Sequence, residues 1–232
     1  MPDAVHCMRI IDDDLGELRA LISEMGGRAE AAVADAVAAL VHRNEDLAQH
    51  VIAEDKKIDA LAMEVERKAI TTIALRHPLA GDLRDVLAAL KIAGCIARMG
   101  DCAKSIAHRS CLLRDCRKID QLKIVPAMQA AVSAMVKASL DAFASRSAHS
   151  AARICADDDQ VDTIYAELVR ALVEHMKVHA EDVAAATHLL MIAQKLERIG
   201  DHASRIAEII HHAATGSYTI RTAGGGEELT LA

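Results

Sequence analysis

The sequence predicts an all-α fold of two pseudo-symmetric antiparallel three-helix bundles, with six long helices in all. Apolar residues recur every three or four positions through most of the 232 residues, which is the period of an amphipathic helix. Aromatic residues make up only 1% of the chain, so aliphatic side chains must fill the core between closely packed alanine-rich helices. A motif near residue 200 also has a copy 100 positions earlier, and an internal repeat constrains the architecture before single residues do.

The clearer copy of the repeated motif is Leu196–Ala203, and the weaker copy is Ile96–Ala103. Residues identical in both copies include Arg98 with Arg198, Gly100 with Gly200, and Asp101 with Asp201. The second helix of each half matches as well, at an offset of 103 residues that relates 51–59 to 154–162. The two halves are therefore expected to repeat the same three helices.

In the first half, apolar spacing and end signals predict three helices. The first covers about 12–40, after a short lead at 1–11. Asn44 can cap the second helix, and Pro78 ends it, because the residue before a proline is pushed out of helical geometry. The third helix covers about 79–114.

In the second half, Pro126 suits the first turn of the fourth helix, because the backbone N–H that proline lacks is not needed there. This helix covers about 126–144, after a polar connection at 115–125. The fifth helix covers about 147–179 and the sixth about 182–213. No β-strand is expected.

These helices are expected to form one body with two repeats and a tail. The first repeat is 1–120, the second is 121–215, and residues 216–232, which contain four glycines, are expected to be a flexible tail. Gly26 and Gly27, in the middle of the first helix, indicate either close packing or a bend, since glycine weakens a helix interior.

Composition and charge exclude several classes of protein. The net charge of −7 argues against a nucleic-acid-binding protein, which normally has a basic face. No uncharged run approaches the roughly 20 residues of a membrane-spanning helix, and the N-terminus lacks the pattern of a signal peptide. The six cysteines include no CxxC pair, so they are expected to be small buried residues in a reducing cytosol, not zinc ligands.

Acidic residues recur four positions apart at related places in the repeat. The pairs are Asp55/Asp59, Asp158/Asp162 and Glu197/Asp201, and the fourth place holds Ala97 and Asp101. Residues four apart share one face of a helix, where like charges cost roughly 0.2–0.5 kcal/mol per pair. Pairs from adjacent antiparallel helices would surround a hard cation such as Mg²⁺, Mn²⁺, Ca²⁺ or iron. Gly100 and Gly200 would let a neighbouring helix or ligand approach closely.

Two other interpretations of these acids stay open at this point. They can form a solvated face, with Asp201 paired to Arg205 one turn later. The chain can also be a carboxylate-bridged metal-dependent enzyme, since Glu208 and His211 have the spacing of a di-iron ligand pair. That site needs a second such pair and two further Glu, and no catalytic base or nucleophile accompanies it, so an enzyme is not expected.

At these residues the sequence resembles the PhoU family of phosphate-transport regulators. Leu196–Asp201 reads LERIGD, the hallmark of that family, and His77–Arg84 resembles its P-x-A-x-DLR segment. The stretches 47–59 and 158–162 resemble its D-x-x-(I/V)-D turns. The resemblance covers about residues 15–216, with the motifs doubled and in the family's order.

The resemblance implies multinuclear metal sites held by acidic motifs, with Fe, Zn, Mn or Mg as candidate ions. Carried over by position, the second site would use Asp158, Asp162, Glu197 and Asp201. The first site would use Asp55, Asp59 and Asp101. Because Cys95 and Ala97 stand where the family usually has acids, the first site is expected to bind fewer ions or to bind them more weakly.

The resemblance also implies a metal-binding negative regulator of phosphate uptake and phosphate-starvation signalling. Such a protein links the ATPase subunit of the phosphate ABC transporter to a phosphate-sensing histidine kinase. It is expected to be a cytoplasmic homodimer that reaches the inner membrane only through these partners, without inserting into it. A metal-free helical adaptor, whose acids merely face solvent, is the remaining alternative.

Overall fold

The computed structural model describes the backbone of residues 2–220 and 229–231. Within these residues the chain forms six long α-helices: α1 (Pro2–His42), α2 (Glu45–Arg76), α3 (Ala80–Leu113), α4 (Val125–Ser145), α5 (Ala148–Val178) and α6 (Val183–Thr215). Two short 3-10 helices lie in the connections: η1 (Asp120–Ile124) and η2 (Ala180–Asp182). The predicted all-α fold is confirmed.

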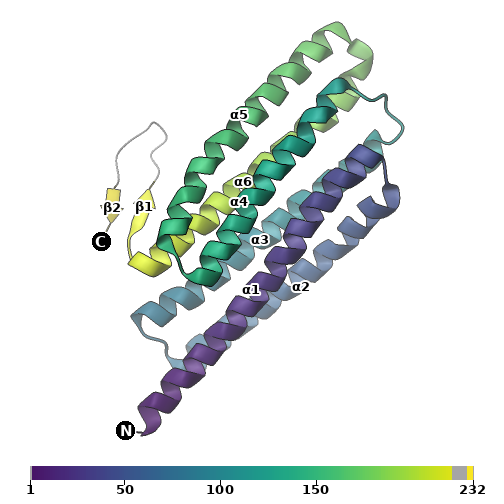
Figure 1. The fold of residues 1–232 in the computed structure, drawn as a ribbon. Coiled ribbons are helices and arrows are strands. Elements are labelled where there is room, and N and C mark those ends of the chain that lie inside the picture. The colour runs from purple at the N-terminus through teal and green to yellow at the C-terminus, as the bar shows by residue number, and fades with distance from the viewer. Residues whose placement is uncertain (1, 221–228, 232) are drawn as a thin grey trace.

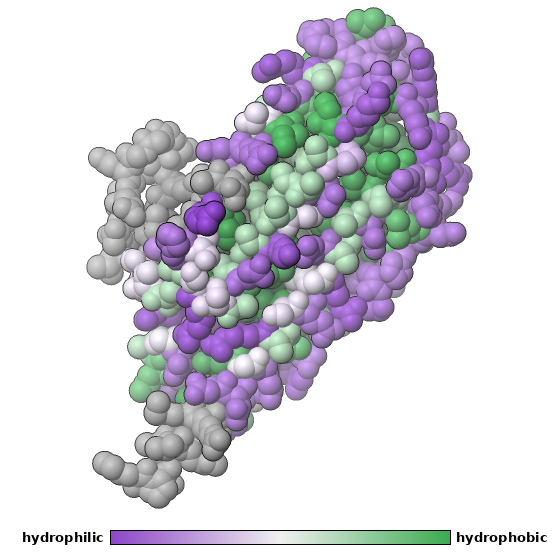
Figure 2. Space-filling view, in the orientation of Figure 1, coloured by the Kyte–Doolittle hydropathy of each residue, from purple (hydrophilic) through white to green (hydrophobic). Residues whose placement is uncertain are grey.

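The helices form two antiparallel three-helix bundles that lie side by side (Figure 1). Helices α1, α2 and α3 pack against one another, and α4, α5 and α6 do the same. The bundles meet where α3 packs on α6 and α1 packs on α4. On the face shown in Figure 2, moderately hydrophobic residues run along α1 and α4 among hydrophilic ones. No described helix combines the length and the uninterrupted apolar character that crossing a membrane requires.

Several helix ends follow the expected chemistry. The side chain of Asn44 accepts a hydrogen bond of 3.0 Å from the backbone N–H of Leu47 and so caps α2. Helix α2 ends at His77, which adopts a left-handed conformation with φ 49° directly before Pro78. Pro126 lies in the first turn of α4. The chain therefore turns where these residues predicted.

The repeat is visible in the pattern of burial. Buried, half-buried and exposed positions follow one another identically along 91–100 in α3 and 191–200 in α6. The largest fully buried side chains are aliphatic or sulfur-containing, as the composition predicted: Leu18, Ile22, Met25, Ile58, Ile92, Ile96, Met99, Ile106, Met128, Met135, Ile154 and Leu168. The two halves therefore bury the same face of their third helices.

The expected lead at 1–11 was wrong, because α1 already begins at Pro2. Proline fits the first position of a helix, where its fixed φ is already helical and its missing N–H is not required. The apolar spacing also continues through Val5, Met8 and Ile11, so the sequence does carry the signal for this part of the helix.

The prediction that the chain has no β-strand was also wrong, because the tail contains a short hairpin. Strands β1 (Tyr218–Ile220) and β2 (Leu229–Leu231) pair antiparallel, with Thr219 opposite Thr230. Threonine and isoleucine favour strands, which is consistent with this pairing. The flexibility expected of 216–232 stays a prediction, and 221–228 and 232 lie outside the described residues.

Gly26 marks a close approach between α1 and α4. A Cβ atom placed there would lie 2.5 Å from both terminal methyl carbons of Leu140. At Gly27, no described atom outside the neighbouring backbone of its own helix lies within 4 Å of such a Cβ. Helix α1 continues through both glycines. Of the two explanations offered for this glycine pair, close packing is therefore the one that the structure supports, at Gly26.

We expect Gly26→Ala to lower the free energy of unfolding by about 1–3 kcal/mol, because the added methyl group must displace Leu140. Gly27→Ala should raise it by up to about 1 kcal/mol, since alanine is the better helix former and that position is open. Urea denaturation of the two variants makes the comparison. Effects of the same sign and size would contradict the close contact.

Candidate metal sites

Four of the predicted metal ligands, all among the described residues, lie on the adjacent helices α5 and α6, but no three of their carboxylate oxygens lie within 4.8 Å of one another. Asp158 and Asp162 lie one turn apart on α5, and a second such pair, Glu197 and Asp201, lies on the antiparallel α6. We call these four residues the second acidic cluster. Asp158 Oδ1 lies 3.6 Å from where a Cβ atom of Gly200 would be, so this glycine lets α5 approach α6 closely.

Burial and mutual repulsion raise the pKa of two carboxyl groups in the second acidic cluster. Burial raises the pKa of Glu197, and the charges of the other three acids raise it further. Burial also raises the pKa of Asp201, with Asp158 and Asp162 adding to the effect. Arg198 opposes both shifts without reversing them. Keeping these carboxylates ionised side by side therefore costs free energy.

Within the described part of the chain, neither Glu197 nor Asp201 forms an ion pair. The solvated-face interpretation paired Asp201 with Arg205, but Arg205 Nη1 lies 2.8 Å from Glu208 Oε2 instead. Glu208, which together with His211 has the spacing of a di-iron ligand pair, is therefore ion-paired with Arg205. The second acidic cluster thus offers oxygen donors from two helices, and carboxylate oxygen is the type of donor that Mg²⁺, Mn²⁺ and iron accept.

The first half holds its three predicted acids in related positions. Asp55 and Asp59 lie one turn apart on α2, and Asp101 lies on α3. We call them the first acidic cluster. Asp55 is only 3% exposed, and its Oδ1 lies 3.3 Å from where a Cβ atom of Gly100 would be. Desolvation raises the pKa of Asp59, and the charges of Asp55 and Asp101 raise it further.

The first acidic cluster also contains a lysine that the sequence analysis missed. Lys104 Nζ donates a hydrogen bond of 2.6 Å to Asp55 Oδ2. This hydrogen bond raises the pKa of Lys104, and the charges of Asp101 and Asp59 raise it as well. Arg98 Nη1 lies 3.6 Å from Asp101 Oδ2. The chain itself therefore supplies positive charge to this cluster, and the prediction of a weaker first site stays a prediction.

A third group of candidate ligands lies at the turn between α5 and α6, and it was not predicted. Within the described residues, only His179, Glu181 and Asp182 bring three ligand atoms within 4.8 Å of one another. His175 Nε2 lies 2.9 Å from Asp182 Oδ2. His179 Nδ1 lies 3.3 Å from Glu181 Oε1. Helix dipoles favour histidines at a helix end and acids at a helix start, so these contacts need no ion.

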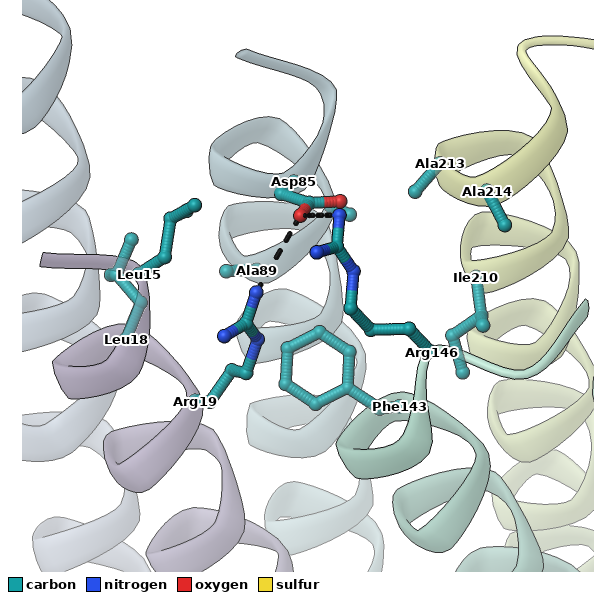
Figure 3. A pocket seen from close by; sticks show the side chains of 11 residues that line it. Leu15, Leu18, Arg19, Asp85, Ala89, Phe143, Arg146, Ile210, Ala213 and Ala214 are labelled. Atoms are coloured by element: carbon teal, nitrogen blue, oxygen red, sulfur yellow. Dashed lines mark ion pairs between the residues drawn. The ribbon is translucent and has the colours of Figure 1, made fainter. Parts of the chain in front are cut away.

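The pocket in Figure 3 lies between the two bundles. Asp85 of α3 is placed between Arg19 of α1 and Arg146, which follows α4. Arg19 Nη2 lies 3.6 Å from Asp85 Oδ2, and Arg146 pairs with the same oxygen. Apolar side chains such as Leu18 and Phe143 line the rest. The volume of about 30 Å³ holds about one water molecule, so this pocket is a junction of the fold and not a ligand site.

Comparison with known sequences shows a doubled family match. The PhoU domain matches residues 22–110 and again residues 125–210. The chain is 46% identical to the phosphate-specific transport system accessory protein PhoU homolog of Zymomonas mobilis, over 91% of this chain and 89% of that protein. A protein of the same name from Caulobacter vibrioides is 41% identical, over 91% of this chain and 92% of its own length.

Solved structures of similar proteins have the same fold. The crystal structure of PhoU from Pseudomonas aeruginosa aligns with a TM-score of 0.85 and 31% identity, covering 88% of this chain and 99% of that one. The phosphate transport system regulatory protein PhoU from Streptococcus pneumoniae also gives 0.85, at 26% identity, covering 91% and 100%. These names describe accessory and regulatory proteins. Because the domain matches both three-helix halves and the relatives align along most of their length, the chain belongs to the PhoU family.

Proposed function

We propose that this chain is a negative regulator of phosphate uptake and phosphate-starvation signalling. It would link the ATPase subunit of the phosphate ABC transporter to a phosphate-sensing histidine kinase. The names of its relatives, which are accessory proteins of phosphate-specific transport, support a role beside the transporter. The kinase link follows from the family resemblance. The chain would act in the cytoplasm as a homodimer, meet the membrane through its partners, and have no catalytic activity.

The second acidic cluster is the observation that supports metal binding. Its four carboxylates come from two helices, and the raised pKa of Glu197 and of Asp201 reflects first their burial and then the charges of the neighbouring acids. A multivalent cation (Fe, Zn, Mn or Mg) would supply positive charge and a fixed coordination geometry. Asp158 and Asp162 would hold it from α5, and the other two acids from α6. The carboxylates would thereby fix the separation of the two helices and the surface that partners meet.

Affinity capture with the tagged protein from phosphate-replete and phosphate-starved cells tests the regulatory role. We expect the transporter ATPase subunit and the kinase to be captured. Asp201→Asn should reduce their capture severalfold, because it removes a charge that holds α5 and α6 together through the ion. Asp141→Asn, the same change at an exposed position of α4, is the control. Failure to capture either partner from both cultures would contradict the function.

Metal content distinguishes the proposal from its two alternatives. Asp201→Ala should lose most of the metal that the wild-type protein binds. Asp101→Ala should lose little, because Lys104 and Arg98 already supply charge to its cluster. Elemental analysis of protein purified without chelator measures both. Equal losses would count against unequal sites, a metal-free wild-type protein would favour the adaptor, and oxygen consumption by the iron-loaded protein would favour the enzyme.

The raised pKa of Asp201 predicts a pH dependence of stability in the metal-free protein. The folded chain holds this proton more tightly than the unfolded chain, so the carboxyl favours folding at low pH. That contribution is lost as the pH rises above the ordinary value of 3.8 and through the raised folded value. Asp201→Asn should therefore raise the midpoint of thermal unfolding at about pH 7 and change it little at about pH 3. Thermal scans with EDTA measure this, and destabilisation at neutral pH would contradict the repulsion.

A further inference from the structure

The two acidic clusters are built on the same backbone. The repeat relates Asp55 to Asp158, Asp59 to Asp162, and Asp101 to Asp201. In each half, an aspartate oxygen of the middle helix lies close to a glycine of the third helix. The distance from that oxygen to where the glycine's Cβ atom would be is 3.3 Å at Gly100 and 3.6 Å at Gly200. A difference in what the clusters bind must therefore come from the side chains around them.

Two related positions differ in charge. Helix α6 has Glu197 where α3 has Ala97, and α3 has Lys104 where α6 has Ser204. Positions four and seven residues apart share a helix face, so both differences lie on the face that carries the cluster. At these two positions α6 has one more carboxylate and one fewer ammonium group than α3. This difference of two charges equals the charge of one divalent ion.

Lys104 has a defined place in the first acidic cluster. Its Nζ lies 2.6 Å from Oδ2 of Asp55, a residue that is only 3% exposed, while the lysine side chain itself is 38% exposed. The lysine thus reaches in from the solvent edge and supplies charge to a carboxylate that burial penalises. An ion bound to the same oxygen would have to displace the ammonium group.

Among the described residues, several buried oxygens have no hydrogen-bond partner, and two of them belong to the residues compared here. One is Asp55 Oδ1, the second oxygen of the carboxylate that Lys104 contacts. The other is Ser204 Oγ, on a residue that is 6% exposed. Buried polar atoms without partners are uncommon in folded proteins. The serine hydroxyl adds no charge, so this position does not supply in the second half the ammonium group that Lys104 supplies in the first.

We propose that Lys104 takes the place of a metal ion in the first acidic cluster, so that only the second acidic cluster of this chain takes a multivalent cation. This inference builds on the metal site proposed above for the second half. The first bundle is then held by a charge within the chain itself, whatever the metal supply. The second bundle alone responds to the metal.

The first test uses metal-free protein. With EDTA present, Lys104→Ser should lower the midpoint of thermal unfolding by several degrees, because the buried carboxylate of Asp55 loses its charged partner. Lys57→Ser is the matched control, since Lys57 pairs with Glu54 on the exposed face of the same bundle. A loss in Lys104→Ser no larger than in the control would overturn the proposal.

The second test measures binding of Mn²⁺ by calorimetric titration. Ala97→Glu together with Lys104→Ser gives the first cluster the residues of the second, and this double variant should bind about one more Mn²⁺ per chain than the wild type. Ala97→Glu alone should not, because the lysine stays in place. Extra binding by the single variant equal to that of the double variant would overturn the proposal. Adding Asp55→Asn to the double variant should abolish the extra binding.

Ser204→Lys separates this proposal from the metal site on which it builds. The variant should lose the Mn²⁺ binding of the wild type, because it places the same ammonium group in the second cluster. If the wild type binds no Mn²⁺ but the double variant does, the proposed metal site fails and the role of Lys104 stands. If the wild type binds Mn²⁺ and the double variant binds no more, only the role of Lys104 fails. If neither binds, both are overturned.

Discussion

Repulsion between carboxylates that close helix packing brings together is the constraint on which the rest of the structure depends. Gly100 and Gly200 let the middle helix of each half lie so near the third helix that an aspartate oxygen reaches the glycine. Like charges placed in this way weaken the pairing of the helices unless a positive charge joins them. The first half meets this requirement with Lys104, which hydrogen-bonds Asp55. In the second half, Glu197 and Asp201 have no ion pair among the described residues.

Much of the fold was predictable, because its signals are local. Asn44 and Pro78 each mark a helix end through the chemistry of their own neighbourhood, and apolar spacing marks the helix faces. The start of α1 was missed although its signals are in the sequence: Val5, Met8 and Ile11 continue the apolar spacing, and a proline at the first position permits a helix. The hairpin was missed because three-residue strands are too short to show a regular alternation.

Of the candidate site, the sequence predicted only the residues that the internal repeat relates to one another. Acids four residues apart and the two offsets identified the members of both clusters, and whether they bind an ion stays a prediction. Lys104 was missed because it acts on Asp55, which lies 49 positions away and on another helix, so no local pattern connects them. Comparing the two copies at every position, and not only at the acids, would have set Lys104 against Ser204. The contact between His175 and Asp182 depends in the same way on how the chain turns between two helices.

The junction at Asp85 has a mechanical consequence. One largely buried carboxylate, on the third helix of the first bundle, holds Arg19 of its own bundle and Arg146 of the other. Near the other end of the helices, the contact between Arg117 and Glu181 is an exposed pair separated by 3.9 Å, which contributes little. A tilt of one bundle against the other that kept both arginines on Asp85 would turn about the Arg146 end. The turn between α5 and α6, at the opposite end of the helices, would then move the most.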